Sequence, residues 1–440
     1  MYRRKLPKEQ WTWAFYDWAN SVYSLVIGTA IFPIYFASVT SAGNGAVQFL
    51  GRTFANSEIY SYSLSLSFLL VAIVSPILSG IADSTGSKKK FLQFFCYLGA
   101  LSSTALYFFT SENQVIAALA LSILASIGFW GSIVFYNSYL PEIAPPEQHD
   151  ELSARGYSLG YLGSSLLLII NLITITYPET FGFKNAAHST RFSFLTVGIW
   201  WAGFAQITFK YLPKTHRTNR FRRGYLVSGY IRIRQVFKQI MRMPYVKLYL
   251  FSFFLFSVGV QTIILIATLF GSQELKLESN QLILTILLIQ FFGIAGAQLF
   301  AFISSKVGNI RALMVNVSIW ITVSTMAYFL DANDAYVMYK FFALGSTVGL
   351  IMGGIQSLAR STYSKMIPPT ENTVSFFSFY DITEKIAIVV GTFLYGAIIG
   401  ITGSMKSSAL MLAVFFLLAI IFLSGVKMRE VRKKKASRYI

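Results

Sequence analysis

Long blocks of apolar residues recur along the whole chain, and they constrain its fold more than any other feature of the sequence. About 20 apolar residues form a helix long enough to cross the roughly 30 Å of hydrocarbon in a bilayer. Only 12% of the residues are charged, whereas a soluble domain has about a quarter. We therefore predict an all-α polytopic membrane protein. The twelve expected spans are residues 14–38, 60–82, 91–110, 114–136, 153–176, 192–212, 246–270, 281–304, 310–330, 335–357, 373–400 and 405–427.

The basic residues are distributed unevenly between the two sides that this map defines. Of the 37 Lys and Arg residues, 30 fall on the side of the N-terminus, 6 on the opposite side, and Lys385 within a span. Lys and Arg gather in cytoplasmic loops, so both termini are expected in the cytoplasm. The same distribution accounts for the net charge of +19, and nucleic acid is not expected as a partner.

A basic linker, residues 213–245, divides the chain into an N-terminal half (1–212) and a C-terminal half (246–440) of six spans each. Part of the linker is amphipathic at helical spacing. The apolar residues on one face are Leu226, Tyr230, Ile233, Phe237 and Ile240. A basic amphipathic helix is expected to lie on anionic lipid headgroups, and a regulatory or partner-binding role is the alternative.

The two halves contain a sequence repeat. Residues 131–157 resemble residues 354–380 at a constant offset of 223. The matched residues are Gly131 and Gly354, Ser138 and Ser361, Pro145-Pro146 and Pro368-Pro369, and Tyr157 and Tyr380. Six helices in each half keep the repeats parallel, related by an axis along the membrane normal. This is the layout of major facilitator transporters, in which the substrate site lies between the halves near the midplane.

The loop after the second span resembles a signature of the same superfamily. It reads GIADSTGSKKK, in which Asp83 and Gly86 match the last two fixed positions of the G-x-x-x-D-x-x-G pattern, and Gly80 lies one residue nearer the aspartate than the first glycine of the pattern. The resemblance implies that Asp83 latches the cytoplasmic side shut by accepting hydrogen bonds from a helix N-terminus, here that of the eleventh span. An ordinary basic cytoplasmic turn is the alternative.

Ionisable residues lie within the eleventh span, where charges are costly. Tyr380, Asp381, Glu384 and Lys385 fall on one polar or small face at 100° per residue, and the opposite face is apolar. Charges at this depth cost about 2.5–3.5 kcal/mol each and by default mark a functional site. Asp381 and Lys385 are also spaced to neutralise one another, which is the structural alternative.

Other polar residues in the spans are candidates for the substrate pathway. Asp17 and Asn20 share one face of the first helix, and Asp17 either pairs with Arg155 or contacts the ligand. Arg360 and Asn137 are repeat equivalents, read first as gate or packing residues. Helix packing and ligand contact are both open for the other polar or aromatic candidates, and for Asn137 as well. Those other candidates are Tyr23, Trp130, Tyr136, Tyr157, Tyr161, Gln261, Gln290 and Gln356.

Four long motifs resemble a known family. They are the stretches Ala14–Ser24, Asn137–Gly163, Gly353–Pro369 and Phe376–Gly396. Together they are similar to the vacuole effluxer-like family of the major facilitator superfamily, which includes the autophagy-related amino-acid effluxer of fungal vacuoles and many bacterial members. The resemblance implies secondary transport, suggests amino acids as substrates, and suggests the bacterial inner membrane as the location. Val258 lies where some members carry an aspartate.

We therefore expect a monomeric secondary active transporter that works by alternating access on a small polar metabolite, with Glu384 as the proton-coupling acid. Export of drugs or other metabolites is one alternative, and a non-transporting membrane receptor is another. The sequence contains no nucleophile–base pair, phosphate loop or histidine spacing typical of a metal site, so we expect neither an enzyme nor a cofactor.

Overall fold

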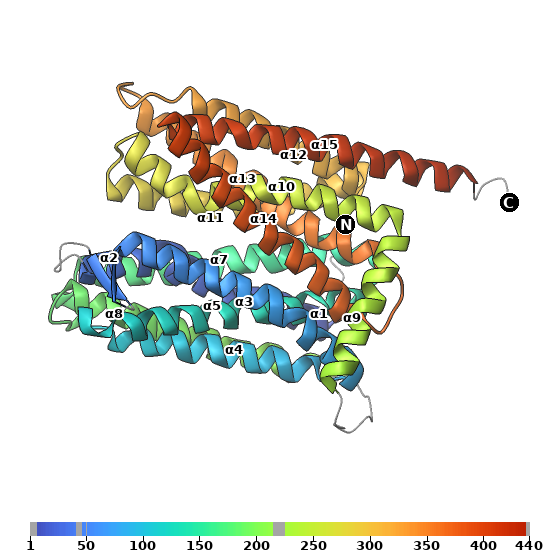
Figure 1. The fold of residues 1–440 in the computed structure, drawn as a ribbon, viewed down its shortest axis with the longest axis horizontal. Coiled ribbons are helices and arrows are strands. Elements are labelled where there is room, and N and C mark those ends of the chain that lie inside the picture. Colours follow the sequence, from blue (N-terminus) through green and yellow to red (C-terminus); the bar gives the residue numbers. More distant parts are fainter. Residues whose placement is uncertain (1–6, 41–45, 50, 214–224, 437–440) are drawn as a thin grey trace. The chain divides into compact units, whose positions relative to one another are not determined.

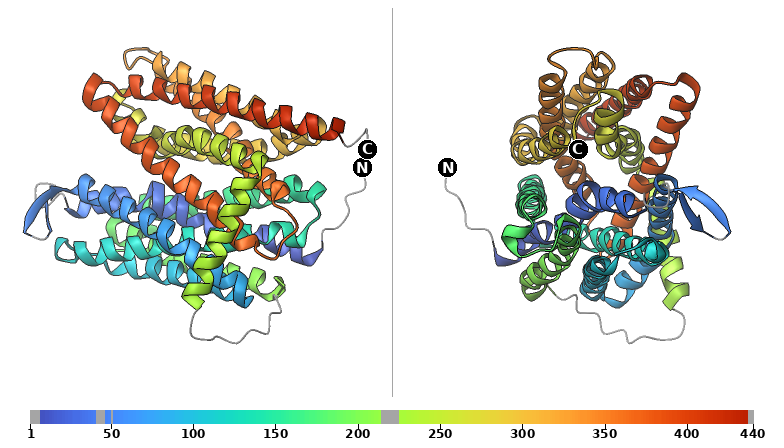
Figure 2. Two further views of the ribbon diagram at one scale, coloured as in Figure 1. Left: turned by 45° about the vertical axis from the view of Figure 1, so that its right-hand side comes forward. Right: turned by 90° about the vertical axis from the view of Figure 1, so that its left-hand side faces the viewer.

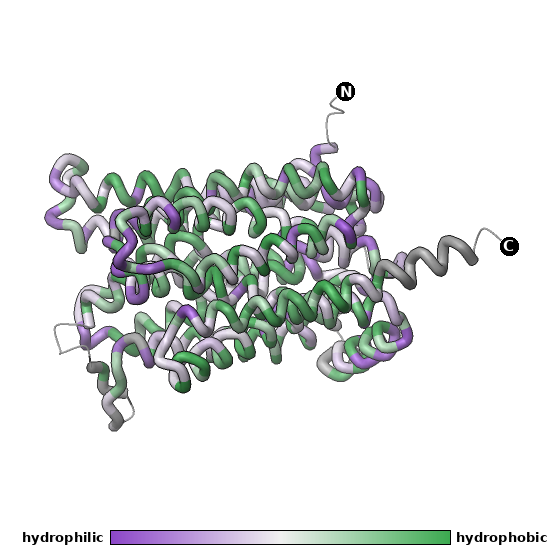
Figure 3. Tube along the Cα trace, turned by 90° about the horizontal axis from the view of Figure 1, so that it is seen from above, coloured by the Kyte–Doolittle hydropathy of each residue, from purple (hydrophilic) through white to green (hydrophobic). Residues whose placement is uncertain are grey.

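The computed structural model describes residues 7–40, 46–49, 51–213 and 225–436. Within these residues, twelve helices are long and apolar enough to cross a membrane, and each coincides with one expected span. The middle parts of the helices are mostly hydrophobic, and hydrophilic residues are concentrated at the helix ends and in the loops (Figure 3). The prediction of an all-α polytopic membrane protein is confirmed.

The chain forms two compact units. Unit 1 comprises residues 1–139 and 159–230, and unit 2 comprises residues 140–158 and 231–440. Two helices, described below, have residues in both units. The main elements that lie wholly in unit 1 are α1 (Lys8–Val22), α2 (Phe32–Thr40), β1 (Ala46–Phe49), β2 (Arg52–Ala55), α3 (Asn56–Thr85), α4 (Lys88–Ala105), α5 (Val115–Asn137) and α8 (Ala186–Tyr211) (Figure 1). Those of unit 2 are α6 (Leu140–Ile143), α10 (Pro244–Leu269), α11 (Ser279–Val307), α12 (Asn309–Tyr328), α13 (Val337–Met366), α14 (Thr373–Thr402) and α15 (Met405–Ala436).

The unit boundaries fall inside two helices. They divide α7 (His149–Thr176) after Ser158 and α9 (Tyr225–Arg242) after Tyr230. Residues 140–158 precede the linker in the sequence, yet they make their contacts within unit 2. This grouping differs from the division at residues 212 and 246 that the sequence suggested.

The sequence repeat is visible in the hydrogen bonds of the first long helix of each half. The indole N–H of Trp13 on α1 donates to the carbonyl oxygen of Tyr136 on α5 at 2.8 Å. The hydroxyl of Tyr249 on α10 donates to the carbonyl oxygen of Ala359 on α13, also at 2.8 Å. The two accepting residues are 223 positions apart, which is the offset of the repeat. Each unit therefore fixes equivalent helices through an equivalent contact.

The first span is not the single helix that we predicted. A π-helical turn, Tyr23–Ala30, separates α1 from α2, and the N–H of Ile31 bonds to the carbonyl oxygen of Val26, five residues earlier. Such turns widen a helix locally and occur often at functional sites. A short antiparallel hairpin of β1 and β2, paired from Ala46 to Ala55, then precedes α3 (Figure 2).

The linker contains the predicted amphipathic helix, α9, and the contact of its apolar face with lipid stays a prediction. Val236 and Ile240 are buried, whereas Tyr230 and Phe237 are exposed. Within unit 1, the first residues of α9 contact α3 closely, since a Cβ atom on Gly80 would lie 2.4 Å from the carbonyl oxygen of Gly229.

Small residues also bring α11 and α13 of unit 2 into backbone contact. A Cβ atom on Gly353 would lie 2.1 Å from the carbonyl oxygen of Gly293, and one on Gly349 would lie 2.4 Å from that of Ile289. Lipid provides no hydrophobic drive for helix association, so close packing of small residues holds such helices together. Side chains larger than hydrogen do not fit at this crossing.

Gly353→Ala should therefore destabilise the protein, because the new methyl group would meet backbone atoms. Overpacking costs about 1–3 kcal/mol, and the melting temperature in detergent should fall by several degrees. Gly396→Ala on α14 is the matched control, because no atom lies within 4 Å of its new Cβ position and alanine favours the helix. Equal melting temperatures for the two variants would contradict this account of the α11–α13 contact.

Candidate functional site

The ionisable residues of the eleventh span lie on the buried face of α14, as the sequence pattern predicted. Tyr380, Asp381 and Lys385 are buried, whereas Ile386 and Phe393 on the opposite face are exposed. At 1.5 Å per residue, the charged residues lie about 12–18 Å along the helix from its first residue, Thr373. This depth is close to the centre of a hydrocarbon layer of roughly 30 Å.

Asp381, Glu384 and Lys385 form one connected cluster, which we call the triad. The Lys385 ammonium lies 2.9 Å from Asp381 Oδ1 and 3.4 Å from Glu384 Oε2. The side chains of Lys385 and Asp381 are 1% and 3% exposed, whereas that of Glu384 is 16% exposed. Glu384 Oε1 accepts a hydrogen bond of 2.6 Å from the side-chain amide of Gln261 on α10.

One carboxylate oxygen of the triad has no donor. Asp381 Oδ2 is buried and makes no hydrogen bond to any residue that the structure describes. With both acids and the lysine ionised, the triad carries a net charge of −1. Burial of an uncompensated charge is strongly unfavourable, so one further positive charge would stabilise the cluster.

Two contacts fix the position of α14 next to the triad. The ring of Tyr380 stacks on that of Phe253 of α10, with ring centroids 4.1 Å apart. Further along, a Cβ atom on Gly391 would lie 2.7 Å from the carbonyl oxygen of Val258. The predicted site residues Tyr380 and Gln261 thus belong to one α10–α14 contact. Gln290 is also buried in unit 2, and Gln356 is half-buried.

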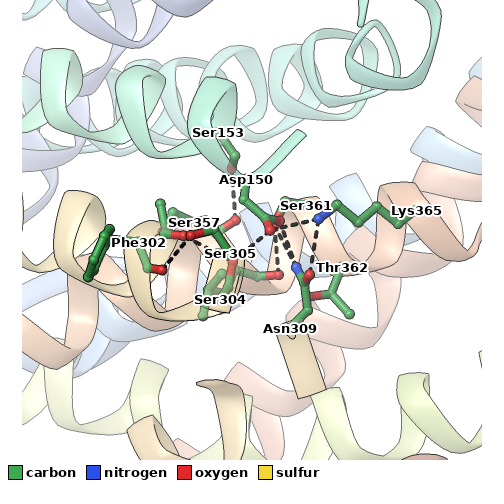
Figure 4. Close-up of polar contacts among 12 residues, drawn as sticks. Asp150, Ser153, Phe302, Ser304, Ser305, Asn309, Ser357, Ser361, Thr362 and Lys365 are labelled. Atoms are coloured by element: carbon green, nitrogen blue, oxygen red, sulfur yellow. Dashed lines mark hydrogen bonds and ion pairs between the residues drawn. The ribbon is translucent and has the colours of Figure 1, made fainter. Parts of the chain in front are cut away.

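A second cluster of unit 2, which we call the Asp150 cluster, lies at the start of α7. The Asp150 carboxylate accepts hydrogen bonds of 2.6 Å from the Lys365 ammonium, the Ser304 hydroxyl and the Asn309 amide. Figure 4 shows these donors converging on the carboxylate from α13, α11 and α12. Charge-assisted bonds to a largely buried carboxylate are the strong kind, so residues near Asp150 are held firmly to unit 2.

Arg360 holds the next turn of α7. Its guanidinium donates to the Ser153 hydroxyl and carbonyl oxygen, both at 2.9 Å, and lies 4.2 Å from the centre of the Tyr157 ring. Arg360 is buried in α13, which extends past residue 357, the end predicted from the sequence. Arg360 thus packs within unit 2, and its role in a cytoplasmic gate stays a prediction.

The repeat relates the Asp150 cluster to another contact. The Thr373 hydroxyl at the start of α14 donates to Glu142 at 2.6 Å. At the offset of 223, Glu142 is equivalent to Lys365, and Asp150 is equivalent to Thr373. The Lys365–Asp150 and Glu142–Thr373 contacts are therefore two copies of one self-complementary arrangement, as in an isologous interface. Sequence reasoning missed these four residues, although the repeat offset already paired them.

The candidates in unit 1 surround α1. The hydroxyl of Tyr136 donates to Asp17 Oδ2 at 2.8 Å. In unit 2, Arg155 forms an exposed ion pair with Glu151. Pairing of Asp17 with Arg155 and contact of Asp17 with the ligand both stay predictions. Asn20 is buried, and its amide nitrogen makes no hydrogen bond within the described residues. The remaining candidates are buried or half-buried: Tyr23, Trp130, Asn137 and Tyr161.

The residues of the loop signature are at the end of α3. Asp83 is buried, and Gly86 ends the helix in the left-handed conformation, at φ 68°. Lys88 is also buried, with its ammonium 3.9 Å from the centre of the Tyr139 ring. The latch role of Asp83 stays a prediction.

Comparison with known proteins decides the family. A family model described as "Vacuole effluxer Atg22 like" matches residues 5–436. The chain is 30% identical over 426 residues to the uncharacterised MFS-type transporter YxiO of Bacillus subtilis strain 168, covering 96% of each chain. The chain belongs to the vacuole effluxer Atg22-like family. It is also 26% identical to autophagy-related protein 22 of Yarrowia lipolytica, covering 88% of this chain and 78% of the relative.

Solved structures agree on the fold of this Atg22-like protein. The proton:xylose symporter XylE matches with a TM-score of 0.71 at 14% identity, covering 95% of each chain. The Escherichia coli fucose:proton symporter FucP matches with a TM-score of 0.66 at 14% identity, covering 95% of this chain and 97% of that one. The protein is therefore an integral membrane protein of the major facilitator type, and its family and fold are those of transporters and not of enzymes.

The Asp150 cluster should contribute measurably to the stability of this Atg22-like protein. A double-mutant cycle of Asp150→Asn and Lys365→Met, followed by unfolding in detergent, should give a coupling energy of about 1–3 kcal/mol. The same cycle on the exposed pair, Glu151→Gln and Arg155→Met, should give about 0.5 kcal/mol or less. Coupling energies of equal size would contradict the special role given to the buried cluster.

Proposed function

We propose that this protein is a secondary active transporter that moves amino acids across a bacterial inner membrane, with proton coupling and alternating access. Both termini are proposed to lie in the cytoplasm, from the distribution of Lys and Arg. The family relatives named autophagy-related protein 22 support an effluxer, and the family model carries the word effluxer in its description.

The observation that carries this proposal is the net charge of the triad. Two carboxylates share one ammonium in a buried part of α14, and Asp381 Oδ2 lacks a donor. A proton that is bound at one stage of the cycle and released at another would supply the missing positive charge. A transporter driven by a pH gradient requires at least one side chain that binds and releases a proton in this way.

Amino acids fit the charges that line this part of unit 2. A zwitterion needs an acid for its ammonium group and donors for its carboxylate. Glu384 is the most exposed member of the triad, and Tyr380 lies one helical turn before it on α14. Acidic and basic side chains at this spacing would orient an amino acid better than a sugar or an apolar drug.

Alternating access would use the Asp150 cluster and its repeat copy. Each of the two contacts joins a residue of the repeat 131–157 to a residue of its equivalent, 354–380. Polar contacts of this kind can break and form again during each cycle, because water at the cytoplasmic surface replaces their hydrogen bonds. We therefore assign them to closure of the cytoplasmic side.

Neutralising Glu384 should abolish transport that is driven by a pH gradient, because the triad then needs no additional proton. The purified protein would be placed in liposomes, and uptake of a mixture of radiolabelled L-amino acids would be measured with a pH gradient of either sign. Glu274→Gln is the matched control, since Glu274 is a similarly buried acid of unit 2 that pairs with Lys406. Gradient-driven uptake that persists at the wild-type rate in Glu384→Gln would refute the coupling role.

A further inference from the structure

The triad has two acids in different environments, and this difference allows their roles to be assigned. Asp381 is almost fully buried, and one of its carboxylate oxygens has no donor within the described residues. Glu384 is partly exposed. Its Oε1 accepts a hydrogen bond from the side-chain amide of Gln261, and its Oε2 lies near the Lys385 ammonium. A ligand that enters from a water-filled path can reach Glu384 more readily than Asp381.

The Lys385 ammonium lies between the two acids. It is 2.9 Å from Asp381 Oδ1 and 3.4 Å from Glu384 Oε2. A change of side-chain torsions is sufficient to bring it into full contact with either one. Lysine suits such exchange because its ammonium is a compact charge on a flexible chain with three rotatable donors.

In the part of the chain that the structure describes, the Lys385 ammonium forms ion pairs with Asp381 and Glu384. One turn away, the ring of Tyr380 lies 5.2 Å from that of Tyr363 of α13, which stacks with Tyr249 of α10. Arg360 of α13 lies 4.2 Å from the centre of the Tyr157 ring of α7. Arg360 donates to Ser153, and the Tyr249 hydroxyl donates to a backbone carbonyl oxygen. Gln261 of α10 contacts the triad directly but carries no charge. Lys385 is thus a cation that contacts both acids of the triad.

We propose that Asp381 holds the proton, that Glu384 binds the ammonium group of the substrate, and that Lys385 moves between them so that proton and substrate exclude one another. With Asp381 protonated, Lys385 pairs with Glu384 and blocks the substrate. With Asp381 ionised, Lys385 pairs with Asp381 and leaves Glu384 free. In both states the buried cluster is neutral, because the proton or the ammonium supplies the missing charge.

This inference rests on the proposed function and specifies it further. Mutually exclusive binding at one site means that one proton returns for each substrate that leaves, so the protein would be an antiporter. It also moves the proton from Glu384, the acid that the sequence suggested, to Asp381. The substrate class becomes compounds with a free, charged ammonium group.

The test measures exchange of amino acids across liposomes that contain the purified full chain, without a pH gradient. A mixture of radiolabelled L-amino acids outside would exchange with the unlabelled mixture inside. Wild-type exchange should be inhibited by acid and should not be inhibited by the corresponding N-acetyl amino acids, which lack the ammonium group. Glu384→Gln should lose exchange at every pH.

Two further variants separate the roles of Asp381 and Lys385. Asp381→Asn should lower exchange at least tenfold, because Lys385 then pairs permanently with Glu384. Adding Lys385→Met should restore exchange to within about threefold of wild type, because Glu384 is free again. Melting temperatures of the purified variants would establish that each is folded and that the comparison is made per folded molecule.

The outcomes distinguish this inference from the proposed function. Exchange that persists in Glu384→Gln, or a folded double variant that exchanges no better than Asp381→Asn, would overturn the assignment while gradient-driven amino-acid transport still stood. A wild-type protein with neither exchange nor gradient-driven uptake of any amino acid would overturn both.

Discussion

A single lysine shared by two carboxylates is the interaction on which the proposed chemistry depends. Lys385, Asp381 and Glu384 lie on the buried face of α14, where a net charge is costly. Any state of the protein must therefore supply one more positive charge or lose stability. The neighbouring helix α10 meets this need only in part, since Gln261 donates a hydrogen bond but no charge. In the proposed mechanism, the triad thus links protonation to occupancy by a cationic group.

The contacts at the start of α7 and α14 would connect this chemistry to motion. Lys365–Asp150 and Glu142–Thr373 are related by the repeat offset, so the same arrangement occurs twice. In a self-complementary contact, the two copies are expected to form and break together. Thr373 is also the first residue of α14, the helix that carries the triad. A change in the hydrogen bonding of Thr373, at the N-terminus of α14, would therefore act on the helix that carries the triad.

The sequence predicted the features that depend on local periodicity. The twelve spans and the polar face of α14 follow from hydropathy and from 100° spacing, and both are present. Features that depend on a partner helix were missed. In the sequence, Asp150 and Lys365 are charged residues near helix ends with no evident partner. The fold places Ser304 of α11 and Asn309 of α12 within hydrogen-bonding distance of Asp150. The contact of Gly229 with Gly80 was missed for the same reason, because periodicity does not encode it.

Infrared difference spectroscopy tests the central claim most directly, because a protonated carboxyl group absorbs separately from a carboxylate. The purified protein without substrate would be prepared with ¹³C in the side-chain carboxyl of either all aspartates or all glutamates. Addition of amino acids should remove one protonated-carboxyl band, which shifts only with labelled aspartate and is absent in Asp381→Asn. No such band, or a band that shifts only with labelled glutamate, would contradict the account.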